Sequence, residues 1–433
     1  MGKKIVITTF GSIGDLNPYI ALARALKVRA HSPTIATSEL YRETVEKAGI
    51  GFYPVRPDID PDDYELVRRI MDPKTGPEIL IKQVLLPRLS ESYRDLLEVS
   101  AGSDLLITHP ITFAGPLVAE KTGIRWISTV LAPLSFFSAY DLPVFAPYPY
   151  LKKLDFLRPW TGKLFLKFGR FVTWDWSAPV RQIRSEIGLP PGKDPIYEGQ
   201  FSPEMTLGLF SPLLAKHGSA APAASPPDWP QNTRVTGFVF HDEPVKRGAE
   251  DTESTRRCEE FLDAGPPPVV FTLGSSAVMA AEEFYRHSFE AARTLGIRAI
   301  LLTGRDTDNR PAEPLPDEIA VFDYVPYSKI FPRSAAIVHH GGVGTSAQAL
   351  KAGKPMLVVP FAFDQPDNAF RLTRLGVGRT LYRNRYCAHR AARELKILLE
   401  HPAYAKKAQR AGIALRSERG LEAACDAIEE VVG

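Results

Sequence analysis

The chain has 433 residues, 44% of them hydrophobic and 24% charged, which is typical of a globular protein with a full core. Its net charge of +3 is too small to indicate nucleic-acid binding, so we expect no nucleic-acid partner. The three cysteines, Cys258, Cys387 and Cys425, form no CxxC pair, so they indicate neither zinc nor a disulfide framework and favour a cytoplasmic location.

The first half of the chain predicts strands that alternate with helices. The strand at 4–10 precedes a helix at about 18–29, with Asn17 as its N-cap and Pro18 as its first residue. Because the chain enters this strand directly, we expect no signal peptide. Further strands are predicted at 33–37, 51–55, 104–108 and 126–130, and further helices at 39–48 and 113–122. The alternation predicts a parallel sheet with helices on both faces.

The middle of the chain breaks this alternation. Residues 131–177 are dense in aromatic residues and proline, and residues 217–232 are rich in Ala, Pro and Ser, as expected of a surface loop. The charged segment 241–254 is the best candidate for an interdomain linker. No run of about 18 apolar residues predicts a membrane span.

A second α/β series follows. Strands are predicted at 268–273, 298–302, 319–322, 335–339 and 356–360, and helices at 281–294, 344–352, 389–400 and 402–432. Two similar halves predict an α/β fold of two Rossmann-like domains that face each other across a cleft, with ligands at the carboxyl ends of the strands. The predicted domains are 1–240 and 255–400, followed by C-terminal helices at 401–433.

The strongest local signal is the segment 337–346, IVHHGGVGTS, in which a buried strand turns on glycines into a helix. Free N–H groups at a helix N-terminus attract anions, and glycine lets the backbone approach a phosphate closely. A dinucleotide fingerprint would need a third glycine, and a P-loop would need a lysine. The segment therefore predicts a nucleotide-diphosphate site, the alternative being a tight turn without a ligand.

Residues 322–368, ending in PFAFDQPDN, resemble the donor-binding signature of the family 1 glycosyltransferases, the UDP-glycosyltransferases. The N-terminal GSIGDLNP at 11–18 resembles the branch with sterol glucosyltransferases and with glycopeptide and macrolide antibiotic glycosyltransferases, whose N-terminal domain is of the family 28 type. The resemblance implies the GT-B architecture, a UDP-sugar as donor and a last helix that packs on the N-terminal domain. Because loop amides and His340 can neutralise the leaving phosphate, we expect no metal or other cofactor.

The resemblance also assigns donor contacts. His340 would contact the phosphates, Asp364 and Gln365 the sugar hydroxyls, and the remaining residues the phosphates, base or ribose: Ser12, Gly14, Gly274, Ser275, Tyr324, Val325, Gly342, Gly344, Thr345 and Gln348. Tyr324 and Gln348 depart from the tryptophan and glutamate of many relatives, which leaves the choice between uridine and thymidine open. An alternative role for Asp364 is to favour a helix N-terminus electrostatically.

An inverting transfer needs a base that takes the proton of the acceptor hydroxyl. Many relatives have a histidine in the first loop and an aspartate on a later strand, whereas this chain has Asp15 and His109 there. We expect Asp15 to be the base and His109 to orient it or share the proton. The alternatives are a loop-completing Asp15 and a structural His109.

Acceptor contacts are expected from the aromatic stretch, namely from Phe136, Phe137, Tyr140, Phe145 and Trp174, with core packing as the alternative. The basic and aromatic run at 152–168 also predicts peripheral contact with a membrane surface. The favoured function is transfer of a hexose, with glucose preferred, from a UDP-sugar to a hydroxyl of a lipophilic small molecule of the sterol, polyketide, flavonoid or terpenoid type. The alternatives are a nucleotide-sugar epimerase or hydrolase and a binding-only protein.

Overall fold

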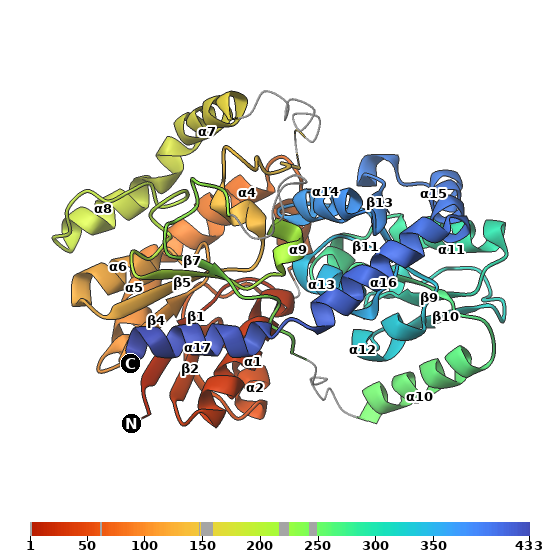
Figure 1. Ribbon diagram of the computed structural model, residues 1–433, viewed down its shortest axis with the longest axis horizontal. Coiled ribbons are helices and arrows are strands. Elements are labelled where there is room, and N and C mark those ends of the chain that lie inside the picture. The colour runs from red at the N-terminus through yellow and green to blue at the C-terminus, as the bar shows by residue number, and fades with distance from the viewer. Residues whose placement is uncertain (1, 61–62, 147, 149–158, 216–224, 242–248) are drawn as a thin grey trace.

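The computed structural model describes all residues except 1, 61–62, 147, 149–158, 216–224 and 242–248 (Figure 1). It contains two α/β halves that lie side by side, each built on one parallel sheet. The first sheet has the strand order β3-β2-β1-β4-β5-β6-β7, and the second has the order β10-β9-β8-β11-β12-β13. The predicted fold class is confirmed.

The first half contains most of the predicted elements and several that the sequence did not predict. Its strands are β1 Lys4–Thr8, β2 Ser32–Thr37, β3 Gly51–Pro54, β4 Leu105–Thr108, β5 Arg125–Val130, β6 Met205–Gly208 and β7 Thr233–Val235. Its helices are α1 Ile13–Val28, α2 Arg42–Lys47, α3 Tyr64–Ile70, α4 Gly76–Ile79, α5 Leu89–Ser100, α6 Ala114–Thr122, α7 Trp160–Thr173, α8 Ala178–Glu186 and α9 Pro212–Ala215. Strands β6 and β7 extend the sheet beyond β5.

Helix α1 begins earlier than predicted, at Ile13, and Pro18 lies inside it. The N-cap is Ser12, not Asn17, because Ser12 and Asp15 form a capping box. The Ser12 hydroxyl accepts from the Gly14 amide at 3.2 Å, while the Asp15 carboxylate accepts from the Ser12 amide at 2.8 Å. These bonds satisfy free amides of the first turn and start the helix there. Asp15 therefore lies in the first turn of α1.

The second half follows the predicted series closely. Its strands are β8 Val269–Thr272, β9 Ala299–Leu302, β10 Ile319–Phe322, β11 Ala336–His339, β12 Met356–Val358 and β13 Gly378–Thr380. Its helices are α10 Ala249–Asp263, α11 Phe284–Leu295, α12 Tyr327–Ile330, α13 Val343–Ala352, α14 Gln365–Leu375, α15 Ala388–Glu400 and α16 Pro402–Arg416. Helix α10 begins inside the segment predicted as a linker, and residues 242–248 of that segment lie outside the described residues.

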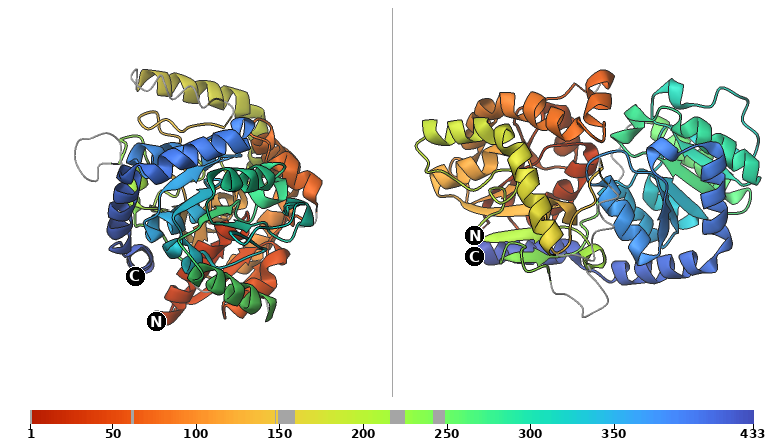
Figure 2. Two further views of the ribbon diagram at one scale, coloured as in Figure 1. Left: turned by 90° about the vertical axis from the view of Figure 1, so that its right-hand side faces the viewer. Right: turned by 90° about the horizontal axis from the view of Figure 1, so that it is seen from above.

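The chain end predicted as one helix is two, α16 and α17 Gly420–Val432. Helix α16 packs on α13, and α17 packs on α1 of the first half, so both termini lie at the same end of the molecule (Figures 1 and 2). Ala424, Cys425 and Ile428 of α17 are buried in the core of that half. The break precedes Gly420, where a Cβ would lie 2.5 Å from the carbonyl oxygen of Phe238.

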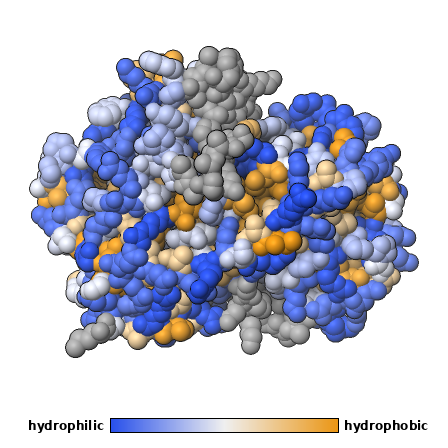
Figure 3. Space-filling model, viewed as in Figure 1, coloured by the Kyte–Doolittle hydropathy of each residue, from blue (hydrophilic) through white to orange (hydrophobic). Residues whose placement is uncertain are grey.

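The seam between the halves is packed. One cluster of buried side chains contains Phe136, Phe210 and Trp229 from the first half together with side chains of the second sheet, such as Ile300 and Ile337. The face in Figure 3 is largely hydrophilic, with apolar patches that include some near the seam. Within the described residues, no helix is both long and apolar enough to cross a membrane.

Candidate active site

The first loop of the first half fixes one carboxylate. Asp15 Oδ2 accepts from the amide of Ser12 at 2.8 Å and from its hydroxyl at 3.0 Å. Gly11 has a φ of +133°, and a Cβ there would lie 2.4 Å from Asp15 Oδ2, so this position requires glycine. The loop therefore presents Asp15 in one orientation, and its Oδ1 makes no hydrogen bond to the described residues. Ser12, predicted as a donor contact, uses its hydroxyl in this cap.

His109 follows β4 and lies within electrostatic reach of Asp15. Its ring contacts the ring of Tyr19 edge-on at 5.8 Å, and its Nδ1 is buried without a hydrogen-bond partner. Burial lowers the pKa of His109, although the charge of Asp15 acts in the opposite direction. No hydrogen bond joins Asp15 to His109 in the described structure. Ser12 holds the Asp15 carboxylate, and the role of His109 in orienting Asp15 or sharing its proton stays a prediction.

The second half places His340 directly after β11. The residue is 5% exposed, and a Cβ would lie 2.6 Å from its ring at Gly274 and 2.3 Å from it at Gly342. These two glycines are thus needed to accommodate the imidazole, in addition to the phosphate contact that the sequence predicts for them. Burial lowers the pKa of His340 to about 4, so the ring is neutral at pH 7. Its Nδ1 is buried without a partner, and a phosphate oxygen that accepted a hydrogen bond would recover the free energy of this unpaired atom.

Helix α13 begins immediately after this turn, with Gly342 as its N-cap. The first hydrogen bond into the helix is from the Ser346 amide to the Gly342 carbonyl at 2.9 Å, so the preceding amides of the first turn are free for an anion. Gly344 is exposed, and a Cβ there would meet nothing within 4 Å. The Ser346 hydroxyl is buried and has no hydrogen-bond partner among the described residues. Thr345 is also buried, beside Tyr327.

The start of α14 lies against the same turn. Asp364 is the N-cap residue of α14, yet its carboxylate caps no amide and instead accepts from Asn368 Nδ2 at 2.7 Å. The same Nδ2 donates to the Gly341 carbonyl at 2.9 Å, so Asn368 joins α14 to the phosphate turn. Gln365 turns its Oε1 to the amides of Phe361 and Ala362, at 2.9 and 3.1 Å. A sugar can therefore meet the amide nitrogen of Gln365 but not its oxygen.

The remaining donor residues lie on neighbouring segments of the second half. Val325 is fully buried, whereas Tyr324, on the loop after β10, and Gln348, on α13, are half-buried. Ser275 lies opposite the first loop, since a Cβ at Gly14 would be 4.0 Å from its hydroxyl. The two loops predicted to contact the donor therefore approach each other across the seam.

Two carboxylates from different halves, Asp15 and Asp364, lie within electrostatic reach of each other in this region. Burial and, secondly, the negative charge of Asp15 raise the pKa of Asp364 to about 7. Near neutral pH, Asp364 is therefore protonated in a part of the molecules and ionised in the others. Asp364 can then donate a hydrogen bond as well as accept one.

The predicted acceptor residues do not all lie together. Phe137, Tyr140 and Phe145 are half-buried, and the rings of Phe137 and Phe145 stack at 6.4 Å. Phe136 is 5% exposed and stacks on Trp229 at 4.0 Å, which favours the alternative of core packing for this residue. Trp174, 57% exposed, lies after α7 under the guanidinium of Arg181.

Both halves of the chain match known glycosyltransferase domains. Residues 5–135 match the glycosyltransferase family 28 N-terminal domain, and residues 298–420 match the erythromycin biosynthesis protein CIII-like C-terminal domain. The chain is 33% identical to O-mycaminosyltylonolide 6-deoxyallosyltransferase of Streptomyces fradiae, over 99% of this chain and 97% of that one. It is 30% identical to a sterol 3-beta-glucosyltransferase of Cryptococcus neoformans, over 98% of this chain but only 27% of that longer protein.

Solved structures show the same fold at low sequence identity. Spinosyn forosaminyltransferase has a TM-score of 0.68 at 18% identity over the whole of both chains. The glycosyltransferase VinC, solved with dTDP, has a TM-score of 0.66 at 20% identity over 99% of each chain. The chain therefore belongs to the GT-B glycosyltransferases that combine a family 28 type N-terminal domain with an EryCIII-like C-terminal domain.

Proposed function

We propose that this glycosyltransferase inverts the anomeric centre as it transfers glucose from UDP-glucose to a hydroxyl of a lipophilic small molecule. The observation that carries the proposal is the arrangement of the seam, where the Asp15 loop faces the His340 turn and Asp364. A base in one half and an anion site in the other are what a displacement at a sugar carbon requires. All relatives named above are glycosyltransferases, which supports transfer over the epimerase or hydrolase reaction.

The leaving diphosphate would lie at the first turn of α13. Free amides of that turn and the imidazole of His340 would stabilise its negative charge. Asp15 Oδ1 would take the acceptor proton, with Oδ2 held by Ser12. We propose that no metal is needed for this step, and we expect turnover in excess EDTA to equal turnover in Mg²⁺.

The hexose assignment depends on Asp364 and on the amide nitrogen of Gln365. Both groups suit a sugar with adjacent ring hydroxyls, because a sugar that lacks one of these hydroxyls would leave one group unpaired at a cost of about 1–3 kcal/mol, whereas a 6-deoxyhexose keeps them. The competing donor is a dTDP-6-deoxyhexose, favoured by the relative that is named a 6-deoxyallosyltransferase. Turnover of UDP-glucose and a dTDP-6-deoxyhexose, measured side by side, decides between them.

The acceptor class is inferred from the aromatic stretch and from the relatives, which are named for a macrolide and for sterols.

Helix α7 supports contact with a lipid surface. Trp160, Leu164, Phe168 and Phe171 are 82%, 70%, 63% and 80% exposed, and their spacing places them along one face of α7. The helix carries Lys163, Lys167 and Arg170 but no acidic residue, and it lies on the outside of the first half (Figure 2).

The test is incubation with UDP-glucose and a panel of sterols, macrolide aglycones and flavonoids, followed by mass spectrometry. A product heavier than an acceptor by one hexose residue supports the proposal, and NMR of its anomeric proton decides inversion. Loss of UDP-glucose without any glycosylated acceptor would contradict it.

The membrane contact is tested separately by sedimentation with vesicles that contain anionic lipid. The wild type is compared with Phe168→Glu.

A further inference from the structure

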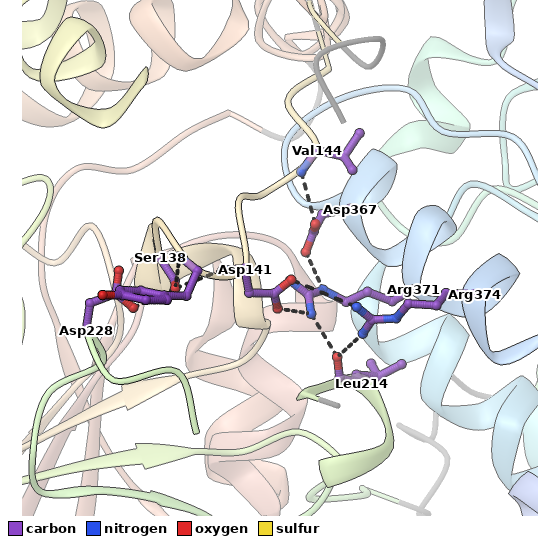
Figure 4. Close-up of polar contacts among 9 residues, drawn as sticks. Ser138, Asp141, Val144, Leu214, Asp228, Asp367, Arg371 and Arg374 are labelled. Atoms are coloured by element: carbon purple, nitrogen blue, oxygen red, sulfur yellow. Dashed lines mark hydrogen bonds and ion pairs between the residues drawn. The ribbon is translucent and has the colours of Figure 1, made fainter. Parts of the chain in front are cut away.

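A buried ionic cluster joins the two halves at helix α14. Arg371 is 1% exposed, and its guanidinium donates to Asp141 Oδ2 and to Asp367 Oδ2, each at 2.6 Å (Figure 4). It also donates to the carbonyl oxygen of Leu214 at 2.8 Å. Asp141 and Leu214 belong to the first half, whereas Asp367 and Arg371 lie on α14. Charged groups that water does not reach therefore bind α14 to the opposite half.

The charges of this cluster are confined to a narrow space. Asp141 and Asp367 are 3% and 0% exposed, and Arg374 lies at the rim, with Nη1 3.9 Å from Asp141 Oδ1. Removing such groups from water costs about as much as their attraction returns, so a buried cluster adds little net stability. It does impose strict geometry, because the donors of Arg371 have fixed directions. The cluster is therefore better explained by what it positions than by stability.

The segment that it positions is the loop 138–144. At one end of the loop, the Ser138 hydroxyl donates to Asp228 of the first half at 2.6 Å. At the other end, the amide of Val144 donates to Asp367 Oδ1 at 3.0 Å (Figure 4). The loop is thus anchored to its own half at its start and to α14 at its end.

Helix α14 also carries the proposed sugar contact. Asp364 precedes Asp367 by three residues and Arg371 by seven, a spacing that brings all three to one side of the helix. The loop 138–144 in turn is flanked by the half-buried aromatic side chains of Phe137 and Phe145. One helix therefore carries the proposed sugar contact at its N-terminus and, through Asp367 and Arg371 of its first two turns, contacts the loop beside the expected acceptor wall.

We propose that Asp141, Asp367 and Arg371 are positioning residues that hold the loop 138–144, with its aromatic side chains, in fixed register with the sugar-binding turn of α14. The consequence for catalysis rests on the proposed function, whereas the attachment of the loop does not. Loosening the cluster should impair acceptor use while leaving the nucleotide site intact.

The first measurement is hydrogen exchange of Asp141→Ala without any acceptor. We expect the Val144 amide to exchange at least about tenfold faster than in the wild type, because the loop opens locally once Arg371 no longer holds it. UDP affinity by calorimetry should stay within about twofold, since the His340 turn is untouched. In the transfer assay, the KM for the acceptor should rise about fivefold or more, with the KM for UDP-glucose nearly unchanged.

Two further variants make the result specific. Asp228→Ala frees the other end of the loop without touching α14, so it should speed exchange at Ala139, whose amide donates to Asp228 at 2.7 Å, and leave Val144 protected. Asp141→Asn keeps an acceptor for Arg371 and should restore most of the protection. If Asp141→Ala does not fold, Arg371→Lys takes its place and should speed exchange at Val144, because an ammonium group lacks the fork of donors that bonds both carboxylates. The proposal is overturned if the Val144 amide of Asp141→Ala exchanges at the wild-type rate. It is also overturned if Asp228→Ala speeds exchange at Val144 as much as Asp141→Ala does. A wild type that transfers no sugar would refute the proposed function alone, because the exchange result stands without turnover.

Discussion

A substitution at Gly344 should change the affinity for the nucleotide without lowering the stability of the fold. It is the second residue of α13, it is exposed, and a Cβ there would meet nothing within 4 Å. Replacing a helical glycine by alanine stabilises a helix by up to about 1 kcal/mol. We therefore expect Gly344→Ala to unfold at the same temperature as the wild type or a few degrees higher.

The affinity for UDP should fall in the same variant, whereas its stability should not. If a phosphate lies over the first turn of α13, the added methyl group prevents it from accepting a hydrogen bond from one amide of that turn. A hydrogen bond to a charged group is worth about 1.5–3 kcal/mol, which corresponds to a rise of about 10- to 100-fold in the Kd for UDP. Calorimetry with UDP and thermal unfolding of the same samples measure the two effects independently.

The matched variant is Gly342→Ala, two residues earlier. A Cβ there would lie 2.3 Å from His340 Nε2, so this change should lower both the unfolding temperature and the affinity for UDP. Unchanged UDP affinity in Gly344→Ala, at normal stability, would refute the placement of the diphosphate at α13.

Three other predictions follow from the site. Asp15→Asn should lower turnover by about 10²–10⁴ while UDP affinity is unchanged, and retention of more than a tenth of turnover would place the base elsewhere. His340→Ala should weaken UDP binding about tenfold or more in calorimetry and lower the unfolding temperature, because the buried imidazole leaves a cavity. Unaltered binding would exclude a phosphate contact. Asp364 should make stability fall as pH rises from about 4 to 7, because the folded state keeps a proton that the unfolded chain loses. In urea titrations, Asp364→Asn should gain stability relative to the wild type over that range, by no more than about 4 kcal/mol, and a constant difference would contradict the raised pKa.

The sheets could be predicted because buried parallel strands are short apolar runs between turn residues. Strands such as β8 and β11 lie within one residue of the predicted ends. The start of α1 could not be predicted from Pro18, because the capping box of Ser12 and Asp15 satisfies the first amides five residues earlier. The break between α16 and α17 depends on close packing at Gly420, a contact that no local pattern reveals.

The candidate site was predictable where one short segment carries several of its groups, as around His340. What each group does there depends on partners far away in sequence. Gln365 is predicted to contact the sugar hydroxyls, but its Oε1 accepts hydrogen bonds from the amides of Phe361 and Ala362 in the loop before it. The pair of Arg371 and Asp141 is separated by 230 residues, so nothing in either segment indicates it.

The first turn of α1 shows why a base can be built at this position. The capping box that starts the helix uses Asp15 Oδ2, which leaves Oδ1 as the oxygen available for a proton. The charge held there helps to raise the pKa of Asp364 across the seam, so the two halves are coupled electrostatically. A carboxyl group that keeps a proton can donate to a sugar hydroxyl, whereas an ionised one can only accept. The group proposed to take the acceptor proton thus also tunes the group proposed to hold the sugar, and bringing the halves together assembles both functions at once.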